Sequence, residues 1–210
     1  MAKKRKLRQE GVLLICTLLV IICGIILVVP PLFQPQQSEF QDSELYKKMV
    51  SSENIDELLA QKGINIGEST KIRSLLRDKL PAGLFLSTFD ITLDKLTVKY
   101  ALTERSACTE EEYADFWSEE NCRQIVMYNS SALFALVRNL DIIEINVEGY
   151  KYPSCFITRD ESTTFFDNRA LDEISTAEDW QQILITDGVD NKDRRDAFFA
   201  AHPLTPDTDA

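Results

Sequence analysis

An unbroken hydrophobic stretch dominates the pattern of hydrophobic and polar positions along this chain. It is VLLICTLLVIICGIILVV at residues 12–29, it contains no charged residue, and Pro30 and Pro31 follow it. A membrane-spanning helix needs about 20 apolar residues, and proline ends a helix because it lacks a donor N–H. The pattern therefore predicts a transmembrane signal-anchor helix over residues 11–33.

Basic residues in front of this stretch predict its orientation. Residues 1–10 form a basic tag that carries Lys3, Lys4, Arg5, Lys6 and Arg8. Basic residues beside a membrane span stay on the cytoplasmic side. We therefore expect a single-pass protein of the cell membrane, with a cytoplasmic N-terminus and an extracytoplasmic C-terminal part. The polar segment QPQQSEFQ at residues 34–41 is expected to act as a linker.

Three other interpretations of the hydrophobic stretch compete with a membrane anchor. A cleaved signal peptide would have a shorter apolar core and a small-x-small cleavage site. A lipoprotein would need a small residue before its cysteine, whereas isoleucine precedes both Cys16 and Cys23. A buried helix of a globular protein seldom runs this long without a polar face. The anchor is favoured, and cleavage stays open as the alternative.

Residues 42–202 alternate between helical and strand patterns. Helices are expected within 42–63 and over 68–80, where Ile72, Leu75, Leu76 and Leu80 form one apolar stripe and Ser69 or Thr70 caps the helix. Further helices are expected over 131–140, capped by Ser130 or Ser131, and over 162–171, 175–183 and 190–201. Strands are expected over 83–93, 95–102, 124–128, 143–147 and 152–158.

The order of these elements predicts the fold class. Helix, strand pair, helix and strand pair succeed one another, which favours an α+β domain in which helices pack on an antiparallel β-sheet. About 170 residues suffice for one domain with its own core. A disordered tail is expected over 203–210.

The segment between Cys108 and Cys122 is unusually acidic and aromatic. Thr109 and Glu112 have the spacing of a capping box. Tyr113, Phe116 and Trp117 then share one helix face. We predict a possible disulfide between Cys108 and Cys122, which would contribute about 3 kcal/mol by loop closure. The three aromatic residues are either a candidate partner surface or a face packed on the sheet.

Charge excludes one class of partner. The chain has 23 Lys and Arg against 34 Asp and Glu, a net charge of −11. Nucleic-acid binding requires a basic surface, so we expect no nucleic-acid partner and interpret the acidity as a source of solubility.

Several stretches resemble the bacterial domain of unknown function 4825 family. They are INIGESTKIRSLLRDKLP, LDKLTVKY, NSSALFALVRNLDIIEIN and FITRDE, which fall between residues 64 and 161. The resemblance implies an extracytoplasmic domain of Gram-positive-type bacteria that is tethered to membranes and is sometimes attached to metallopeptidase-type signalling proteins. It implies no catalytic residues, and the segment between Cys108 and Cys122 departs from the family pattern.

The chemistry of the chain favours binding over catalysis. The one histidine, His202, lies in the terminal segment, where a catalytic base would be poorly held. The chain has no zinc, calcium, nucleotide or other cofactor pattern, and TDGVDNKD at residues 186–193 is interpreted as a turn and helix cap. We therefore predict a non-enzymatic binding or sensory module of the cell envelope with a protein partner. The alternatives are a regulatory subunit of a membrane sensor or metallopeptidase and an envelope hydrolase that uses carboxylates.

Overall fold

The computed structural model describes residues 55–106, 108–149 and 154–204. The chain divides into two units, Met1–Ser38 and Glu39–Ala210, and every described residue belongs to the second. The predicted tag, transmembrane helix and linker lie outside the described residues. Within the described ranges, no helix combines the length and the apolar character needed to cross a bilayer.

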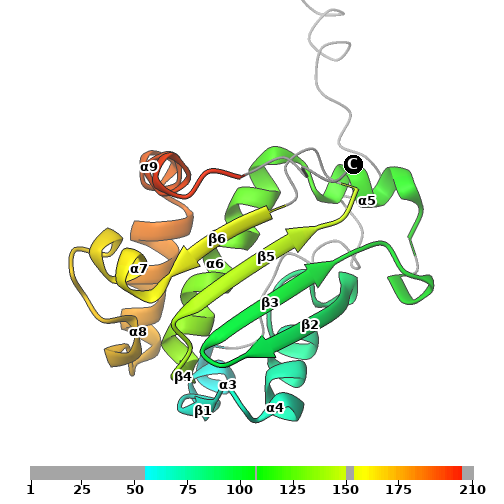
Figure 1. Ribbon diagram of the computed structural model, residues 1–210. Coiled ribbons are helices and arrows are strands. Elements are labelled where there is room, and N and C mark those ends of the chain that lie inside the picture. The colour runs from blue at the N-terminus through cyan, green and yellow to red at the C-terminus, as the bar shows by residue number, and fades with distance from the viewer. Residues whose placement is uncertain (1–54, 107, 150–153, 205–210) are drawn as a thin grey trace, which may run out of the picture. The chain divides into compact units, whose positions relative to one another are not determined.

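A four-stranded sheet organises the described domain (Figure 1). Its strands are β2 (Leu86–Thr92), β3 (Lys95–Tyr100), β5 (Ile142–Val147) and β6 (Ser154–Thr158), in the order β2-β3-β5-β6. The β2/β3 and β5/β6 pairs are antiparallel, but β3 and β5 run parallel. The α+β class is confirmed, and the prediction of an antiparallel sheet is wrong at its centre.

The parallel pair follows from the long connection between β3 and β5. This connection contains α5 (Glu110–Phe116) and α6 (Glu119–Leu136). The 18 residues of α6 extend about 27 Å at 1.5 Å per residue. A helix of this length returns the chain to the end of the sheet where β3 began, so the next strand enters in the same direction.

Helix α6 also replaces the predicted strand at 124–128. The helix begins earlier than expected, because Ser118 caps it by accepting a hydrogen bond from the backbone N–H of Asn121. Ser130 and Ser131, the predicted caps, are buried within it. The predictions of the strand and of the caps are therefore wrong.

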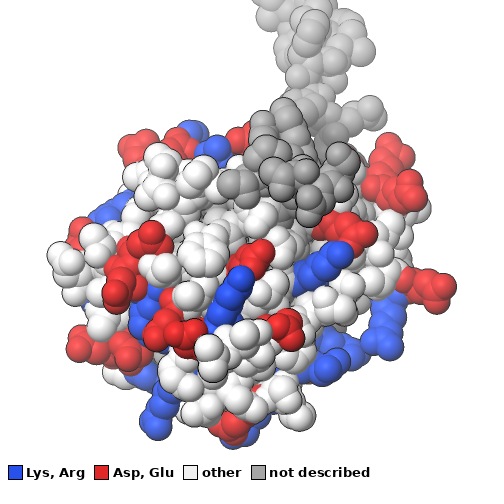
Figure 2. Space-filling model, in the orientation of Figure 1, with Lys and Arg blue, Asp and Glu red and all other residues white. Residues whose placement is uncertain are grey.

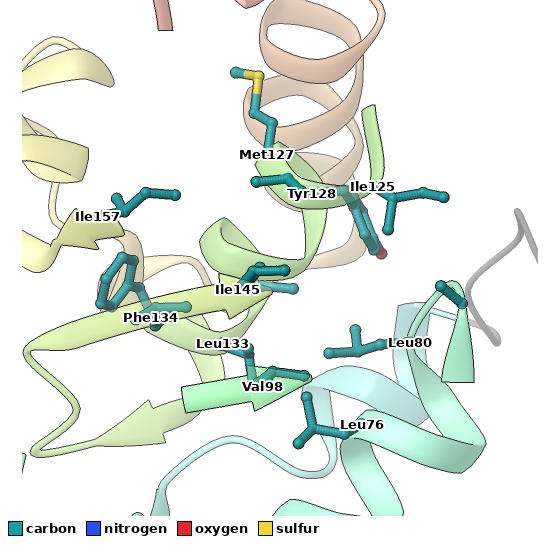
Figure 3. Packing of buried hydrophobic residues seen from close by; sticks show 14 of the residues in the cluster. Leu76, Leu80, Val98, Ile125, Met127, Tyr128, Leu133, Phe134, Ile145 and Ile157 are labelled. Atoms are coloured by element: carbon teal, nitrogen blue, oxygen red, sulfur yellow. The ribbon is translucent and has the colours of Figure 1, made fainter. Parts of the chain in front are cut away.

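The surroundings of α6 explain why its periodicity is hard to recognise. Its Leu133 and Phe134 meet Val98, Ile145 and Ile157 of the sheet (Figure 3). Elsewhere it contacts η4 (Leu171–Glu173), η5 (Trp180–Val189) and α9 (Lys192–Ala201). A helix that is covered on several sides is apolar on several sides, and the usual polar stripe is missing.

The N-terminal part of the described domain consists of short elements that precede β2 in the chain. It contains α3 (Ile55–Leu59), β1 (Ile64–Asn65), α4 (Ser69–Ser74), a π-helical turn η1 (Leu75–Lys79) and a 3₁₀ turn η2 (Gly83–Phe85). Strand β1 pairs in parallel with β4 (Val137–Arg138). The helix predicted over 68–80 is confirmed as α4 and η1. Its N-cap is Glu68 rather than Ser69 or Thr70.

Three of the remaining helices lie towards β6 (Figure 1). Helix α7 (Arg159–Phe165) begins earlier than the predicted 162–171, because Thr158 and Glu161 form a capping box. Helix α8 (Ala177–Asp179) is capped by Thr176 and begins the helix predicted over 175–183, which continues as η5. Helix α9 confirms the helix predicted over 190–201. A short 3₁₀ turn, η3 (Glu104–Ser106), follows β3.

Candidate binding surface on the open face of the sheet

The two faces of the sheet differ in what covers them. The inward side chains of β3, β5 and β6 are almost fully buried; they are Leu96, Val98, Tyr100, Ile143, Ile145, Val147, Cys155 and Ile157. The outward side chains are partly or fully exposed; they are Lys95, Thr97, Lys99, Ile142, Glu144, Asn146, Ser154, Phe156 and Thr158. Basic, acidic and uncharged side chains are interspersed on this open face (Figure 2).

The strand register fixes which outward side chains are neighbours. Thr97 of β3 is aligned with Glu144 of β5, and Glu144 is aligned with Phe156 of β6. On the other side of Thr97 lies Asp90 of β2. One row across the sheet therefore combines two carboxylates, a hydroxyl and an aromatic ring, because residues that are opposite in register project to the same face.

Lys95 and Glu144 form the central ion pair of this face. The Lys95 Nζ lies 2.6 Å from the Glu144 Oε2. Glu144 also accepts hydrogen bonds from the Thr97 hydroxyl at 3.4 Å and from the Asn146 amide at 3.3 Å. The hydrogen bond from Lys95 lowers the pKa of Glu144, although partial burial opposes this effect. These contacts within the chain hold the polar groups of the open face in a fixed orientation.

Phe156 supplies the apolar part of the surface. Its side chain is 50% exposed, which makes it one of two large exposed hydrophobic residues in the described chain. The Lys95 Nζ lies 5.8 Å from its ring centroid, within the range of a cation–π contact. A half-exposed aromatic ring beside oriented charged groups is suited to contact a protein partner.

The aromatic residues predicted as a candidate partner surface lie in the core instead. Tyr113, Phe116 and Trp117 are 7%, 0% and 1% exposed. Phe85 packs among them, with its ring centroid 5.0 Å from that of Tyr113 and 4.8 Å from that of Phe116. The helix and its Thr109–Glu112 capping box were predicted correctly. The face turns inward because burying three large rings is more favourable than exposing them.

The cysteines of the described domain are free thiols. Cys108 is half-buried, and Cys122 and Cys155 are buried. The predicted Cys108–Cys122 disulfide is thus not formed in this structure. Burial raises the pKa of both Cys122 and Cys155 to about 12. A thiol with so high a pKa is a poor nucleophile at neutral pH, because the thiolate is the reactive form.

His202 is held firmly, which corrects the expectation of a poorly held terminal residue. It is 5% exposed, and its ring centroid lies 4.7 Å from that of Phe198. Its Nδ1 lies 3.9 Å from the Glu161 Oε2. The Cys155 thiol donates to the backbone carbonyl oxygen of His202 at 3.8 Å. Cysteine, histidine and carboxylate therefore meet here, but the thiol is directed at a carbonyl and has a raised pKa, so the arrangement favours packing over nucleophilic catalysis.

The remaining chemical candidates have structural explanations. In the TDGVDNKD segment, Asn191 caps α9 by accepting a hydrogen bond from the Arg194 N–H, as expected of a turn and cap. Across the part of the chain that the structure describes, no group of three or more His, Cys, Asp or Glu side chains is placed to hold a metal ion.

The fold and its surface define an α+β domain with a mixed sheet, one face buried under helices and one face open to solvent. Residues 58–156 match the family model described as Domain of unknown function (DUF4825), which is the family that the stretches between residues 64 and 161 resemble. The match runs from α3 into β6 and includes every residue of the open face except Thr158. No curated protein and no solved structure matches the chain.

Proposed function

We propose that this chain is a membrane-anchored, non-enzymatic binding module that presents its acidic domain outside the cytoplasmic membrane and contacts an envelope protein through the open sheet face. The observation that carries the proposal is the oriented Lys95–Glu144 pair beside the half-exposed ring of Phe156. The hydrophobic stretch at 12–29 and the basic residues before it support the anchor and its orientation.

The contacts on the open face suit a reversible protein contact. Lys95 and Glu144 are already paired, so binding costs less side-chain entropy than if a partner had to order these two side chains. Phe156 offers apolar area to bury, and aromatic residues are enriched among the side chains that dominate interface energies. The surrounding Thr97, Asn146 and Ser154 supply hydrogen-bonding groups for the rim.

Thiol labelling of intact cells tests the topology. Cys108 is the reporter, because it is only half-buried while Cys122 and Cys155 are buried. After treatment with a membrane-impermeant reductant, an impermeant maleimide is expected to label the chain before lysis. The Cys108→Ser variant is expected to lose this label. Labelling that appears only after lysis would place the domain in the cytoplasm and overturn the topology.

Site-specific photo-cross-linking in host cells tests the partner. A photo-reactive residue at Asn146, on the open face, is expected to give a discrete cross-linked product with another protein. The matched control position is Gln181, an exposed residue of η5 on the helical side. Equal products from both positions, or none from Asn146, would contradict the use of the open face.

A further inference from the structure

We infer that the free edge of β2 accepts an extended segment of the partner as a fifth strand, and that this segment carries a basic side chain between apolar ones. The inference rests on the proposed function, because it concerns the same partner and specifies how part of it binds. It starts from the backbone of β2, which ends the sheet order on one side.

The register shows which backbone groups of β2 face outward. Thr92 is aligned with Lys95 across a two-residue turn, and Asp90 with Thr97. Residues that flank a two-residue hairpin turn exchange hydrogen bonds, and the hydrogen-bonded positions alternate from there along the strand. Phe89 and Ile91 therefore direct their N–H and C=O groups away from β3, and the described chain places no strand beside them.

The two edges of the sheet are covered differently. At the β6 edge, the inward side chains of Cys155 and Ile157 are 1% and 0% exposed. At the β2 edge, Phe89 and Ile91 point to the same covered side but remain partly exposed. The guanidinium carbon of Arg73 lies 5.2 Å from the Phe89 ring centroid. Arg73 covers only part of this ring, because Phe89 remains partly exposed. An added strand at β2 would bury more of both side chains.

β2 has little of the protection that free edges usually carry. Natural edge strands are commonly blocked by proline, lysine or bulges. The irregularity in β2 lies between Leu86 and Thr88, and the pairing from Thr88 to Thr92 is regular. This five-residue segment, TFDIT, contains neither proline nor a basic residue. It is long enough to pair with an extended peptide.

The negative charge of Asp90 and of the whole chain favours a basic partner segment. Asp90 is the single charged residue of the segment and is exposed. Antiparallel pairing of two copies of this chain over the whole segment would place Asp90 opposite Asp90, and like charges directly opposite are destabilising. A basic side chain opposite Asp90 is favourable instead, and the net charge of −11 favours a basic partner at long range. Apolar side chains at the alternate positions would meet Phe89 and Ile91.

Hydrogen exchange with a model peptide tests the strand addition on the full-length chain in detergent. The probe is the capped peptide Ac-Thr-Val-Lys-Val-Thr-NH₂, compared with the same peptide carrying Glu in place of Lys. The Lys peptide is expected to slow amide exchange at Phe89 and Ile91 at least tenfold and to leave Asp90, whose N–H faces β3, unchanged. The Asp90→Lys variant is expected to prefer the Glu peptide. Failure of the Lys peptide to protect these two amides, or an unchanged preference in Asp90→Lys, would overturn the inference.

The natural partner gives a second test that separates this inference from the proposed function. The Asp90→Lys variant is expected to lower the yield of the Asn146 cross-link at least fivefold, whereas Asp172→Lys, which changes an exposed acid on η4, is expected to leave it unchanged. An undiminished cross-link in Asp90→Lys would retain the open face as a binding surface and overturn strand addition at β2. If the chain without a substitution at Asp90 or Asp172 gives no cross-link from position 146, the proposed function itself is contradicted.

Discussion

Arg159 and Phe134 contact each other in two ways. The Arg159 Nη1 donates to the Phe134 carbonyl oxygen at 2.9 Å, and the guanidinium carbon lies 5.3 Å from the Phe134 ring centroid. The same guanidinium donates to the carbonyl oxygens of Val137 and Leu140, each at 2.9 Å. These carbonyls lie at the C-terminal end of α6 and just beyond it, where helical carbonyls lack intrahelical partners and favour a positive charge.

Replacing Arg159 is therefore expected to destabilise the domain. Arg159→Ala should lower the free energy of unfolding by about 3 kcal/mol, because it removes several charge-assisted hydrogen bonds to partly buried carbonyls. Arg159→Lys should recover only part of the loss, since lysine lacks the planar fork of donors. Urea denaturation measures the effect. Arg105→Ala, an exposed control on η3, is expected to change stability by less than about 0.5 kcal/mol; equal losses in the two variants would refute this role for Arg159.

Gly83 allows η2 to approach the preceding π-helical turn. A Cβ atom at Gly83 would lie 2.1 Å from the Arg77 carbonyl oxygen and 2.6 Å from its carbonyl carbon. Because both are backbone atoms, the chain itself must move, and Gly83→Ala is expected to cost more than about 2 kcal/mol. In the control Gly67→Ala, the nearest atom is the Asn65 side-chain oxygen at 3.2 Å. We expect it to stay within about 1 kcal/mol of the unmodified protein, and thermal unfolding compares the two.

Asn129 joins α6 to β3 inside the core. Its Nδ2 donates to the Tyr100 hydroxyl and to the Pro81 carbonyl oxygen, both at 3.0 Å. Tyr100→Phe removes one of these partners and is expected to cost about 1 kcal/mol. A double-mutant cycle with Asn129→Ala should give a coupling energy of about 1 kcal/mol, because residues in direct contact are not additive. Additive effects of the two substitutions on urea unfolding would show that this hydrogen bond contributes no stability.

His202 is expected to make stability depend on pH in the weakly acidic range. Burial lowers the pKa of His202 below its ordinary value, although Glu161 opposes the shift. As pH falls through the ordinary histidine pKa of about 6.5, the unfolded chain binds a proton that the folded chain does not. The free energy of unfolding is then at its highest above this pKa and falls as pH decreases towards the lower pKa of the folded state.

Unfolding measured at several pH values between about 7.5 and 5 checks this expectation. His202→Gln should remove the slope, since His202 is the one histidine of the chain. Glu161 also contributes to the pH dependence of the free energy of unfolding, but at lower pH than His202. Hydrogen bonds from Thr158 lower its pKa, so its stabilisation is present above the ordinary glutamate pKa and is lost as pH falls through the lowered value. A slope near pH 6 that persists in His202→Gln would contradict the assignment to His202.

Local patterns predicted the elements that have one covered and one open side. The stripe of Ile72, Leu75 and Leu76 gave the helix that became α4 and η1, and the alternation in LTVKY gave β3. Such patterns are informative because the side-chain period matches the backbone period wherever one face is buried. The Thr109–Glu112 capping box could likewise be predicted from the sequence, because it depends on residues only three positions apart.

Tertiary packing decided what these local patterns leave open. The sequence by itself determined the α+β class, most of the elements, the acidic character and the hydrophobic stretch at 12–29. Only the folded structure decided that α6 carries the chain back to pair β5 in parallel with β3, that Tyr113, Phe116 and Trp117 turn into the core, and that Phe156 stays on the surface beside Lys95. The physical reason is that periodicity shows which side chains share a face, whereas the partner that each face meets depends on contacts between residues far apart in the chain.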